Sequence, residues 1–127
     1  MNDPSTVLIL FAHGSKVPQA NKAVMHLAGQ IANRAGCPAI AAFLEIADPD
    51  LPVAMNRAAG LGAKRVIIVP YFLTLGVHMQ RDLPEIIRRQ QPLHPEVEFR
   101  IAQPLEGHPC LPDALLDRMR EAGIVEP

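Results

Sequence analysis

The sequence has few cysteines, no excess of basic residues and no long apolar run. Its 127 residues include only two cysteines, Cys37 and Cys110, which form no CxxC pair. Two widely spaced cysteines exclude a disulfide scaffold, so we expect both to be free thiols. The formal net charge is −1, which argues against nucleic-acid and anionic-membrane partners because these require a clear basic excess.

The first apolar run, Val7 to Ala12, is too short to cross a bilayer. No basic residue precedes it and no cleavage pattern of a secretory signal follows it. We therefore interpret the run as a buried strand and expect the protein to stay in the cytoplasm. The length suits one domain, and no linker or low-complexity tract divides the chain. We expect a single domain over residues 1–127.

Apolar strand patterns alternate with amphipathic helix patterns along the chain. Apolar runs typical of buried strands lie at 7–12, 39–44 and 66–69, and residues 97–102 are predicted as a fourth strand. Helical spacing follows each run, at 18–35, 50–60, 82–91 and 111–122. We expect Pro18, Asp50 and Asp82 at helix starts, with Pro84 in the first turn of the third helix, and Gly36 at a helix end.

This alternation predicts an α/β fold with right-handed crossovers. The expected architecture is a three-layer sandwich, in which helices flank both faces of a four-stranded parallel sheet. The simplest strand order is 2-1-3-4, which is half of a flavodoxin-like sheet.

Polar side chains follow the first three strands: His13, Glu45 and, after a stretch of loop, His78. Ligands of open parallel sheets bind beyond the carboxyl ends of the strands, where the winding reverses. We therefore expect these side chains to converge on one edge of the sheet. Two imidazoles and a carboxylate suit a divalent ion such as Co²⁺, Fe²⁺, Ni²⁺ or Zn²⁺, and they equally suit proton abstraction near neutral pH. The spacing matches neither HxxxH nor HExxH.

The segment 70–77, PYFLTLGV, is unusually apolar for a loop and holds two of the five aromatic residues. Loops normally run over the surface and are polar there. An apolar loop at the expected edge suggests a flat hydrophobic ligand, a subunit interface or both. Lys16 and Arg81 lie close in sequence and could bind ligand carboxylates, Arg81 as a bidentate fork and Lys16 as a point charge.

Each candidate also has a purely structural explanation. His13 could be a turn histidine bonded to the backbone, and Glu45 could cap the next helix or pair with a lysine. Lys16 and Arg81 could be solvated surface charges. The side chains of Tyr71, Phe72 and Leu75 could belong to a subunit interface. The other histidines, His26, His94 and His108, are expected to be structural or exposed.

Three stretches carry a resemblance to a known family: LILFAHGSK at 8–16, AFLEIADPDLP at 42–52 and VPYFLTLGVHMQRDLPEI at 69–86. A weaker one is PLEGHPCLPDALLDR at 104–118. They resemble the small class II tetrapyrrole chelatases, the short sirohydrochlorin cobaltochelatases and ferrochelatases of the CbiX/SirB type. The combination of HGS, FLE and GVH after three successive strands is the most specific part of the likeness.

The resemblance implies a lyase that inserts a divalent metal, Co²⁺ or Fe²⁺, into sirohydrochlorin in cobalamin or siroheme biosynthesis. The metal, with Ni²⁺ as a further option, is then a substrate, and no permanently bound cofactor is expected. His13 and His78 correspond to the catalytic histidines, and Glu45 completes the metal-binding set. Short members pair as homodimers.

The same resemblance gives the expected contacts with the ring, a flat macrocycle that bears many carboxylates. The apolar loop residues Tyr71, Phe72 and Leu75 would lie against the macrocycle, and Lys16 and Arg81 would hold its carboxylates. The family motif often reads HGSR, and here Lys16 replaces the arginine. This keeps the charge and loses the bidentate fork.

Two other functions remain possible at this level. A histidine phosphatase places its nucleophilic histidine in an RHG motif after the first strand, but Ala12 occupies the position of that arginine. A non-catalytic carrier of tetrapyrrole or metal would keep all the candidate ligands, and only turnover would distinguish it from an enzyme.

Overall fold

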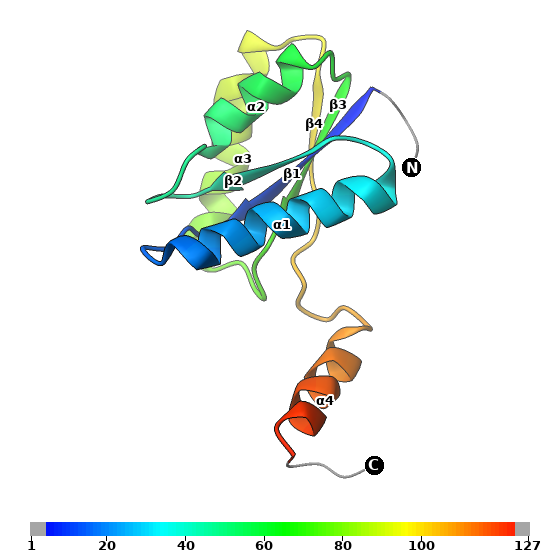
Figure 1. The fold of residues 1–127 in the computed structure, drawn as a ribbon. Coiled ribbons are helices and arrows are strands. Elements are labelled where there is room, and N and C mark those ends of the chain that lie inside the picture. The colour runs from blue at the N-terminus through cyan, green and yellow to red at the C-terminus, as the bar shows by residue number, and fades with distance from the viewer. Residues whose placement is uncertain (1–4, 124–127) are drawn as a thin grey trace.

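Four parallel strands form the central sheet in the order β2-β1-β3-β4, as the sequence predicts (Figure 1). The computed structural model describes residues 5–123. Residues 1–4 and 124–127, which the expected domain also includes, lie outside the described residues. The strands are β1 (Thr6–Ala12), β2 (Ala39–Phe43), β3 (Arg65–Pro70) and β4 (Glu98–Ile101). The helices are α1 (Pro18–Ala35), α2 (Leu51–Gly60), α3 (Val77–Gln90) and α4 (Leu111–Glu121), with a 3₁₀ turn η1 (Gln91–Leu93).

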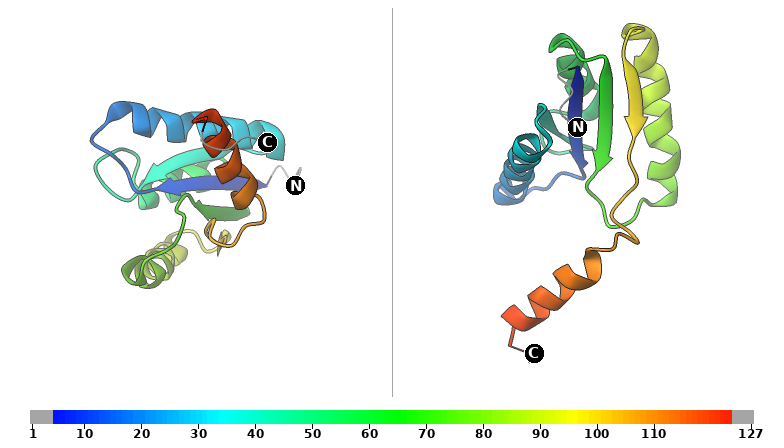
Figure 2. Two further views of the ribbon diagram at one scale, coloured as in Figure 1. Left: turned by 90° about the horizontal axis from the view of Figure 1, so that it is seen from below. Right: turned by 90° about the vertical axis from the view of Figure 1, so that its right-hand side faces the viewer.

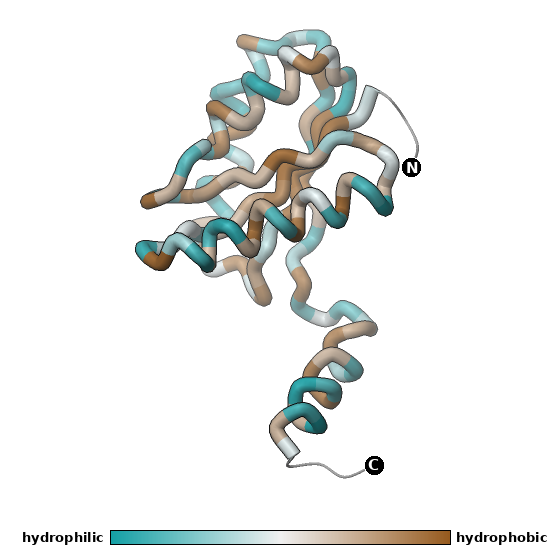
Figure 3. The backbone as a smooth tube through the Cα atoms, viewed as in Figure 1, coloured by the Kyte–Doolittle hydropathy of each residue, from teal (hydrophilic) through white to brown (hydrophobic). Residues whose placement is uncertain are grey.

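Helices cover both faces of the sheet, which confirms the expected three layers (Figure 2). All seven residues of β1 are buried, because β1 lies between β2 and β3 and is covered on both sides. On one face, α1 packs on β1 and β2 through Val24 and Ala28. On the other face, α2 and α3 enclose the larger core, and the apolar stretches converge on the sheet (Figure 3).

The cover over β3 and β4 is incomplete on the α1 side. Burial alternates along β3, where Val66, Ile68 and Pro70 are buried and the residues between them are half-buried. These half-buried side chains and their β4 neighbours form what we call the open sheet face: Arg65, Ile67, Val69, Glu98 and Arg100. Helices therefore flank both faces of the sheet, as predicted, but on the α1 side they cover β1 and β2 more fully than β3 and β4.

Two of the predicted helix starts are confirmed and one is wrong. Pro18 begins α1, and the Asp50 side chain caps α2 by accepting a hydrogen bond from the Val53 amide (3.0 Å). The third helix begins at Val77 and not at Asp82, so Pro84 lies inside it. Its start lacks a side-chain cap. The Gln80 side chain donates to the Leu75 carbonyl (2.8 Å) and ties the preceding loop to the first turn, a contact that propensity rules do not anticipate.

The last helix, α4, stands away from the sheet and does not complete a layer (Figures 1 and 2). The chain that leads to it is tied to the loop after β3, since the Leu105 and Glu106 amides donate to the carbonyls of Phe72 (3.1 Å) and Leu73 (2.7 Å). Within residues 5–123, no helix combines the length and apolarity needed to span a membrane.

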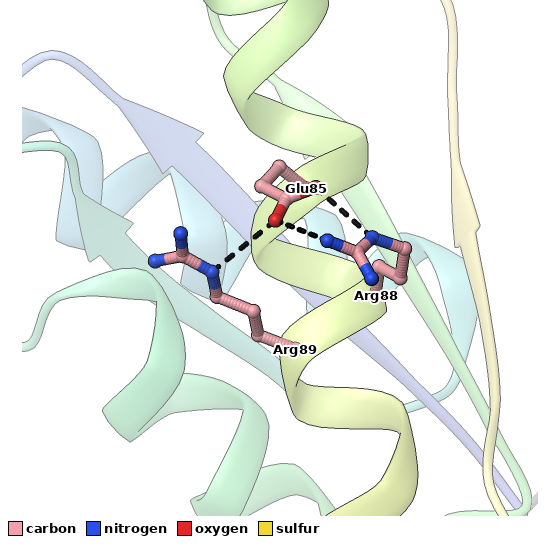
Figure 4. Close-up of polar contacts among 3 residues, drawn as sticks. All are labelled: Glu85, Arg88 and Arg89. Atoms are coloured by element: carbon pink, nitrogen blue, oxygen red, sulfur yellow. Dashed lines mark hydrogen bonds and ion pairs between the residues drawn. The ribbon is translucent and has the colours of Figure 1, made fainter.

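An ion-pair cluster on the outer side of α3 yields a prediction about pH and stability. The Glu85 carboxylate accepts hydrogen bonds from Arg88 and Arg89 (Figure 4). The bond from Arg88 is the main cause that lowers the pKa of Glu85 below its ordinary value of 4.5. A lowered carboxyl pKa contributes stability above the unfolded pKa, and this stability is lost as the pH falls through the folded pKa.

We therefore expect Glu85→Gln to reduce the free energy of unfolding slightly at pH 7, since exposed ion pairs contribute little. The difference from wild type should shrink as the pH falls through the lowered pKa of folded Glu85, because the carboxyl is then protonated in both states. Urea denaturation over a series of pH values from 7 downwards measures this. A deficit that stays the same size throughout the series would contradict the electrostatic explanation.

Candidate active site

His13 and Glu45 lie side by side because each follows the carboxyl end of a strand, β1 and β2 respectively. The Leu44 amide donates to the Ala12 carbonyl (2.9 Å), and the Glu45 amide donates to the His13 carbonyl (3.2 Å). These bonds continue the parallel pairing past the strand ends, so both side chains leave the sheet at its carboxyl edge. Both are exposed to solvent. Because Asp50 caps α2, Glu45 does not serve as that cap.

Gly14 makes this close approach of the two loops possible. Its φ is +95°, and a Cβ at this position would lie 2.0 Å from the Glu45 carbonyl oxygen. Any other residue would force the loops apart or clash with that carbonyl. The turn after Glu45 is also unusual, because Ile46 has a φ of 75°, which is costly for a β-branched residue.

The His13 imidazole is oriented by its own loop. Its Nδ1 lies 3.2 Å from the Gly14 carbonyl oxygen, which can only accept a hydrogen bond. In a neutral imidazole, this partner assigns the proton to Nδ1 and leaves Nε2 free to bind an ion or to take a proton. His13 is therefore a turn histidine bonded to the backbone, and this same bond leaves it suited to act as a ligand or base.

His78 is the second residue of α3, whereas the sequence pattern predicts it in a loop. Its Nδ1 lies 3.2 Å from Nη2 of Arg81, and a guanidinium can only donate. The proton of a neutral His78 is therefore on Nε2. Binding an ion through Nε2 requires a change of tautomer, and binding through Nδ1 requires Arg81 to leave. Arg81 is thus a direct neighbour of the candidate ligand and not merely a solvated surface charge.

One open cavity of about 440 Å³ brings His13, Glu45 and His78 together at the carboxyl edge. Its other lining residues are Leu44, Phe72, Gly76, Val77, Met79 and Asp82. A larger hollow of about 600 Å³ lies at the far end of α3, but its lining of Pro84, Ile87, Arg88, Gln91, Pro92 and Pro95 offers no metal ligand or proton acceptor. We choose the first cavity as the candidate site because its lining, and not its volume, suits metal binding and proton transfer.

Of the residues predicted to contact a ligand, some line this cavity and others lie in neighbouring hollows. Phe72 lines it and is fixed by its ring contact with Phe11, with ring centres 5.8 Å apart. Tyr71 lines a neighbouring hollow on the α1 side that also includes His13. Leu75 lines a hollow between α3 and the exit of β4. Lys16 is exposed in the loop before α1, outside the lining of the cavity.

The cavity does not form a ready-made ion site within one chain. Among residues 5–123, no three His, Cys, Asp or Glu side chains lie close enough together to hold a metal ion. The assignment of His13, Glu45 and His78 as metal ligands therefore stays a prediction. The geometry brings the three to one cavity whose open side could admit an ion.

Sequence reasoning did not anticipate that Asp82 lines the cavity. The sequence pattern places Asp82 at the start of the third helix, but it lies one turn after His78 and lines the same cavity. The HxxxD spacing places both side chains on one face of a helix. That signal becomes readable only once the helix is known to begin before His78.

The remaining histidines and cysteines take the structural roles expected of them. His94 bonds to the Asn56 side chain (2.6 Å) and packs edge-on against Phe99. His108 accepts a hydrogen bond from the Cys110 amide (3.0 Å) in a turn, and His26 is exposed on α1. Both cysteines are free thiols; Cys37 is buried and Cys110 is exposed.

Comparison with known proteins points to one family. The family model described as CbiX matches residues 7–122. The sirohydrochlorin cobaltochelatase of Methanopyrus kandleri is 26% identical over 91% of this chain and 95% of its own length. The chloroplastic sirohydrochlorin ferrochelatase of Arabidopsis thaliana is 28% identical over 89% of this chain and 51% of its own. Matches to several other archaeal cobaltochelatases reach 36% identity and span just over half of those proteins, 56–59%.

Solved structures agree with the fold. A putative cobalamin biosynthesis CbiX protein from Marinobacter aquaeolei is 33% identical, with a TM-score of 0.79 over 92% of this chain and 96% of that one. SirB from Bacillus subtilis, solved with Fe³⁺, shares the fold with a TM-score of 0.84 at 23% identity. That match covers 95% of this chain but 48% of SirB. This chain therefore matches one half of the longer protein in fold.

Proposed function

The chain belongs to the CbiX family, and we propose that it is a sirohydrochlorin chelatase, a lyase that inserts a divalent metal ion into the ring. The observation that carries the proposal is the match of the family model to residues 7–122, together with the cavity shared by His13, Glu45 and His78. Relatives named as cobaltochelatases and as a ferrochelatase support Co²⁺ and Fe²⁺ as the metal substrates. Family membership gives no support to a histidine phosphatase.

Metal insertion requires three events, and the cavity offers groups that can bind the ion and accept protons. The ion must lose its bound water, it must be held near the ring, and two pyrrole N–H protons must leave. The unprotonated Nε2 of His13 is presented to bind the ion or to accept a proton. The Glu45 carboxylate offsets the positive charge of the ion. No resident cofactor is needed, because the ion itself is a substrate.

His78 supplies the second nitrogen once Arg81 leaves it. A substrate carboxylate is a better partner than an imidazole for Arg81, because a guanidinium pairs with a carboxylate through two parallel hydrogen bonds. Ring binding would therefore draw Arg81 away and expose Nδ1 of His78 to the ion. Lys16 would hold another carboxylate as a point charge. The apolar residues Tyr71, Phe72 and Leu75 would contact the macrocycle.

The same family supports a homodimer as the working unit. The cavity is open on one side, so a single copy would leave one face of a bound ring in water. In fold, the chain also matches half of SirB. A second copy placed against the carboxyl edge would supply a second set of His13 and His78.

We place the reaction in the cytoplasm, where an exposed thiol such as that of Cys110 stays reduced.

An optical assay tests the proposal. We expect purified protein mixed with sirohydrochlorin to accelerate the change in the visible spectrum of the ring when Co²⁺ or Fe²⁺ is added, with Ni²⁺ as the third ion tried. Each molecule of protein should metallate many rings. A rate equal to the protein-free background with all three ions would reject the enzyme. A single stoichiometric transfer without further turnover would instead identify a carrier.

A further inference from the structure

Asn21 occupies a position in α1 at which asparagine contributes little to the helix itself. It is the fourth residue of α1, and asparagine is a weaker helix former than alanine, leucine or lysine. The cause is its side-chain amide, which competes for hydrogen bonds outside the helical ladder. In this chain the Asn21 side chain is half-buried and bonds back to the loop after β1. The residue therefore serves that loop and not the helix.

The Asn21 amide pairs with both backbone groups of Ser15. Its Oδ1 accepts a hydrogen bond from the Ser15 amide (2.9 Å), and its Nδ2 donates to the Ser15 carbonyl (2.8 Å). The orientation of the side-chain amide is unambiguous, because a backbone N–H can only donate and a backbone carbonyl can only accept. One side chain thus holds residue 15 by the same two bonds that a paired antiparallel strand would supply.

The Ser15 N–H belongs to the same peptide unit as the carbonyl that orients His13. A peptide unit is rigid and planar, and in its trans form the N–H and the carbonyl point in opposite directions. The Gly14 carbonyl faces Nδ1 of His13 (3.2 Å), while the Ser15 N–H faces Asn21 (2.9 Å). Because the unit turns only as a whole, the bond at Asn21 also fixes the direction of the carbonyl.

Gly14 is the residue about which this peptide unit would otherwise turn over. Glycine has the widest range of backbone conformations, and here its φ is +95°. The peptide unit before Gly14 is already held, since the His13 carbonyl accepts a hydrogen bond from the Glu45 amide (3.2 Å). Asn21 holds the peptide unit after it. The two bonds together tie the backbone on both sides of the glycine.

Loss of the bond at Asn21 has a specific chemical consequence at His13. When the peptide unit turns over, the Ser15 N–H and not the Gly14 carbonyl faces Nδ1 of the imidazole. An N–H can only donate, so Nδ1 then accepts, and the proton of the neutral ring is on Nε2. A protonated Nε2 neither binds a metal ion nor takes a proton. The orientation of one peptide unit therefore decides whether Nε2 of His13 is available.

Asn21 and His13 also line one hollow of about 390 Å³ on the α1 side. Direct contact between Asn21 and a ligand is therefore the alternative to a role through His13. Both polar atoms of the amide, Oδ1 and Nδ2, already hold a bond to Ser15. This use of the amide favours a role through the loop.

We propose that Asn21 is a positioning residue for the reaction at His13. It fixes the peptide unit between Gly14 and Ser15, and through this unit it keeps the proton of the neutral imidazole on Nδ1. The inference deepens the proposed function and rests on it. Groups that orient a metal ligand typically change metal affinity or activity about 10–100-fold when they are removed.

NMR of the ring nitrogens tests the effect without any substrate. Long-range proton–nitrogen correlation spectra of the full chain, recorded at a pH at which the imidazoles are neutral, distinguish the two tautomers. The His13 signal, identified by its loss in His13→Ala, should report the Nδ1–H form in the wild type. Asn21→Ala should shift it toward the Nε2–H form. An Asn21→Ala protein with the wild-type tautomer of His13 would overturn the proposal.

Steady-state kinetics in the optical assay measure the effect on the reaction. Asn21→Ala should lower kcat about 10–100-fold and leave the KM for sirohydrochlorin within about twofold, since the contacts with the ring are unchanged. The matched control is Asn33→Ala, the same substitution at an exposed position of α1, which should keep the wild-type kcat. A raised KM at wild-type kcat in Asn21→Ala would refute the positioning role, because it would show direct contact with the substrate.

Asn21→Asp separates the two bonds of the side chain. An aspartate keeps the acceptor for the Ser15 N–H but cannot donate to the Ser15 carbonyl. Because the first bond fixes the peptide unit, Asn21→Asp should keep the Nδ1–H form of His13 and a kcat within about fivefold of wild type. An Asn21→Asp protein as slow as Asn21→Ala would contradict the proposal, since the bond to the Ser15 N–H would then not be the one that matters.

The two readouts separate this inference from the proposed function. A shift of the His13 tautomer in Asn21→Ala, in a protein whose wild type inserts no metal, would refute the chelatase and leave the positioning role in place. Metal insertion by the wild type, together with an unchanged tautomer in Asn21→Ala, would refute the positioning role and leave the chelatase in place.

Discussion

Replacing His13 by alanine should lower the rate of metal insertion into sirohydrochlorin about 10²–10⁴-fold, the range by which a positioned acid or base contributes. His13 lines the cavity, and in its neutral form Nε2 is free to act, because the Gly14 carbonyl holds the proton on Nδ1. No other ring nitrogen in the cavity is presented in this form, since Arg81 occupies Nδ1 of His78. The initial rate of the spectral change at saturating Co²⁺ is the measurement.

The control for this loss is His26→Ala. His26 is exposed on α1 and lines no part of the cavity, so its removal should leave the rate within about twofold of wild type. The His13 side chain is also exposed, so neither change should shift the melting temperature by more than a few degrees. A His13→Ala protein that keeps full activity would refute the site assignment without refuting the enzyme.

His78→Ala should cause a loss of similar size, and the two losses should not add. Residues that act together on one step show strongly non-additive effects when they are removed together. The double variant should therefore be about as slow as the slower single variant. Losses that multiplied would mean that the two imidazoles act at separate steps.

Gly14→Ala should destabilise the fold by about 3–5 kcal/mol, which is at the upper end for a single substitution. Two costs combine at this position. A φ of +95° is strained for alanine by roughly 1–3 kcal/mol, and the new Cβ would lie 2.0 Å from the Glu45 carbonyl oxygen. Relief of that clash requires the loop after β1 to move away from the loop after β2. Any protein that still folds should therefore also insert metal more slowly.

Gly62→Ala isolates the effect of the clash. Gly62 has a similar φ of +86°, but a Cβ at this position would meet nothing within 4 Å. Its replacement should cost only the conformational strain, roughly 1–3 kcal/mol. Urea denaturation of both variants and the wild type gives the comparison. Equal losses in the two variants would show that the contact with Glu45 is unimportant.

Much of the fold could be predicted because the local signals were unambiguous. The unbroken apolar run of β1 could only be a strand covered on both sides, and Pro18, Gly36 and Asp50 act at helix ends as expected. The start of α3 could not be predicted in this way. Its N-cap, Gly76, carries no capping side chain, and the Gln80 side chain instead ties the preceding loop to the helix by donating to the Leu75 carbonyl.

The location of the candidate site could be predicted from the sequence, but the hydrogen bonds of its histidines could not. Parallel strands end at a common edge, so the residues after β1, β2 and β3 had to lie near one another. The states of the two histidines depend on close contacts with the Gly14 carbonyl and with Arg81, which no spacing rule contains. The same holds for Asp82, whose place in the cavity follows from the early start of α3.

The order of apolar runs and turn residues was enough to predict the α/β alternation, a simplest strand order that the structure has, and the edge where His13, Glu45 and His78 meet. These features follow from local periodicity and from the handedness of crossovers, which act on any chain with this pattern. The amphipathic pattern of residues 111–122 equally indicated a helix, but not what the helix covers. That depended on the backbone bonds of Leu105 and Glu106 to the loop after β3, contacts between segments far apart in the sequence, which direct α4 away from its own sheet.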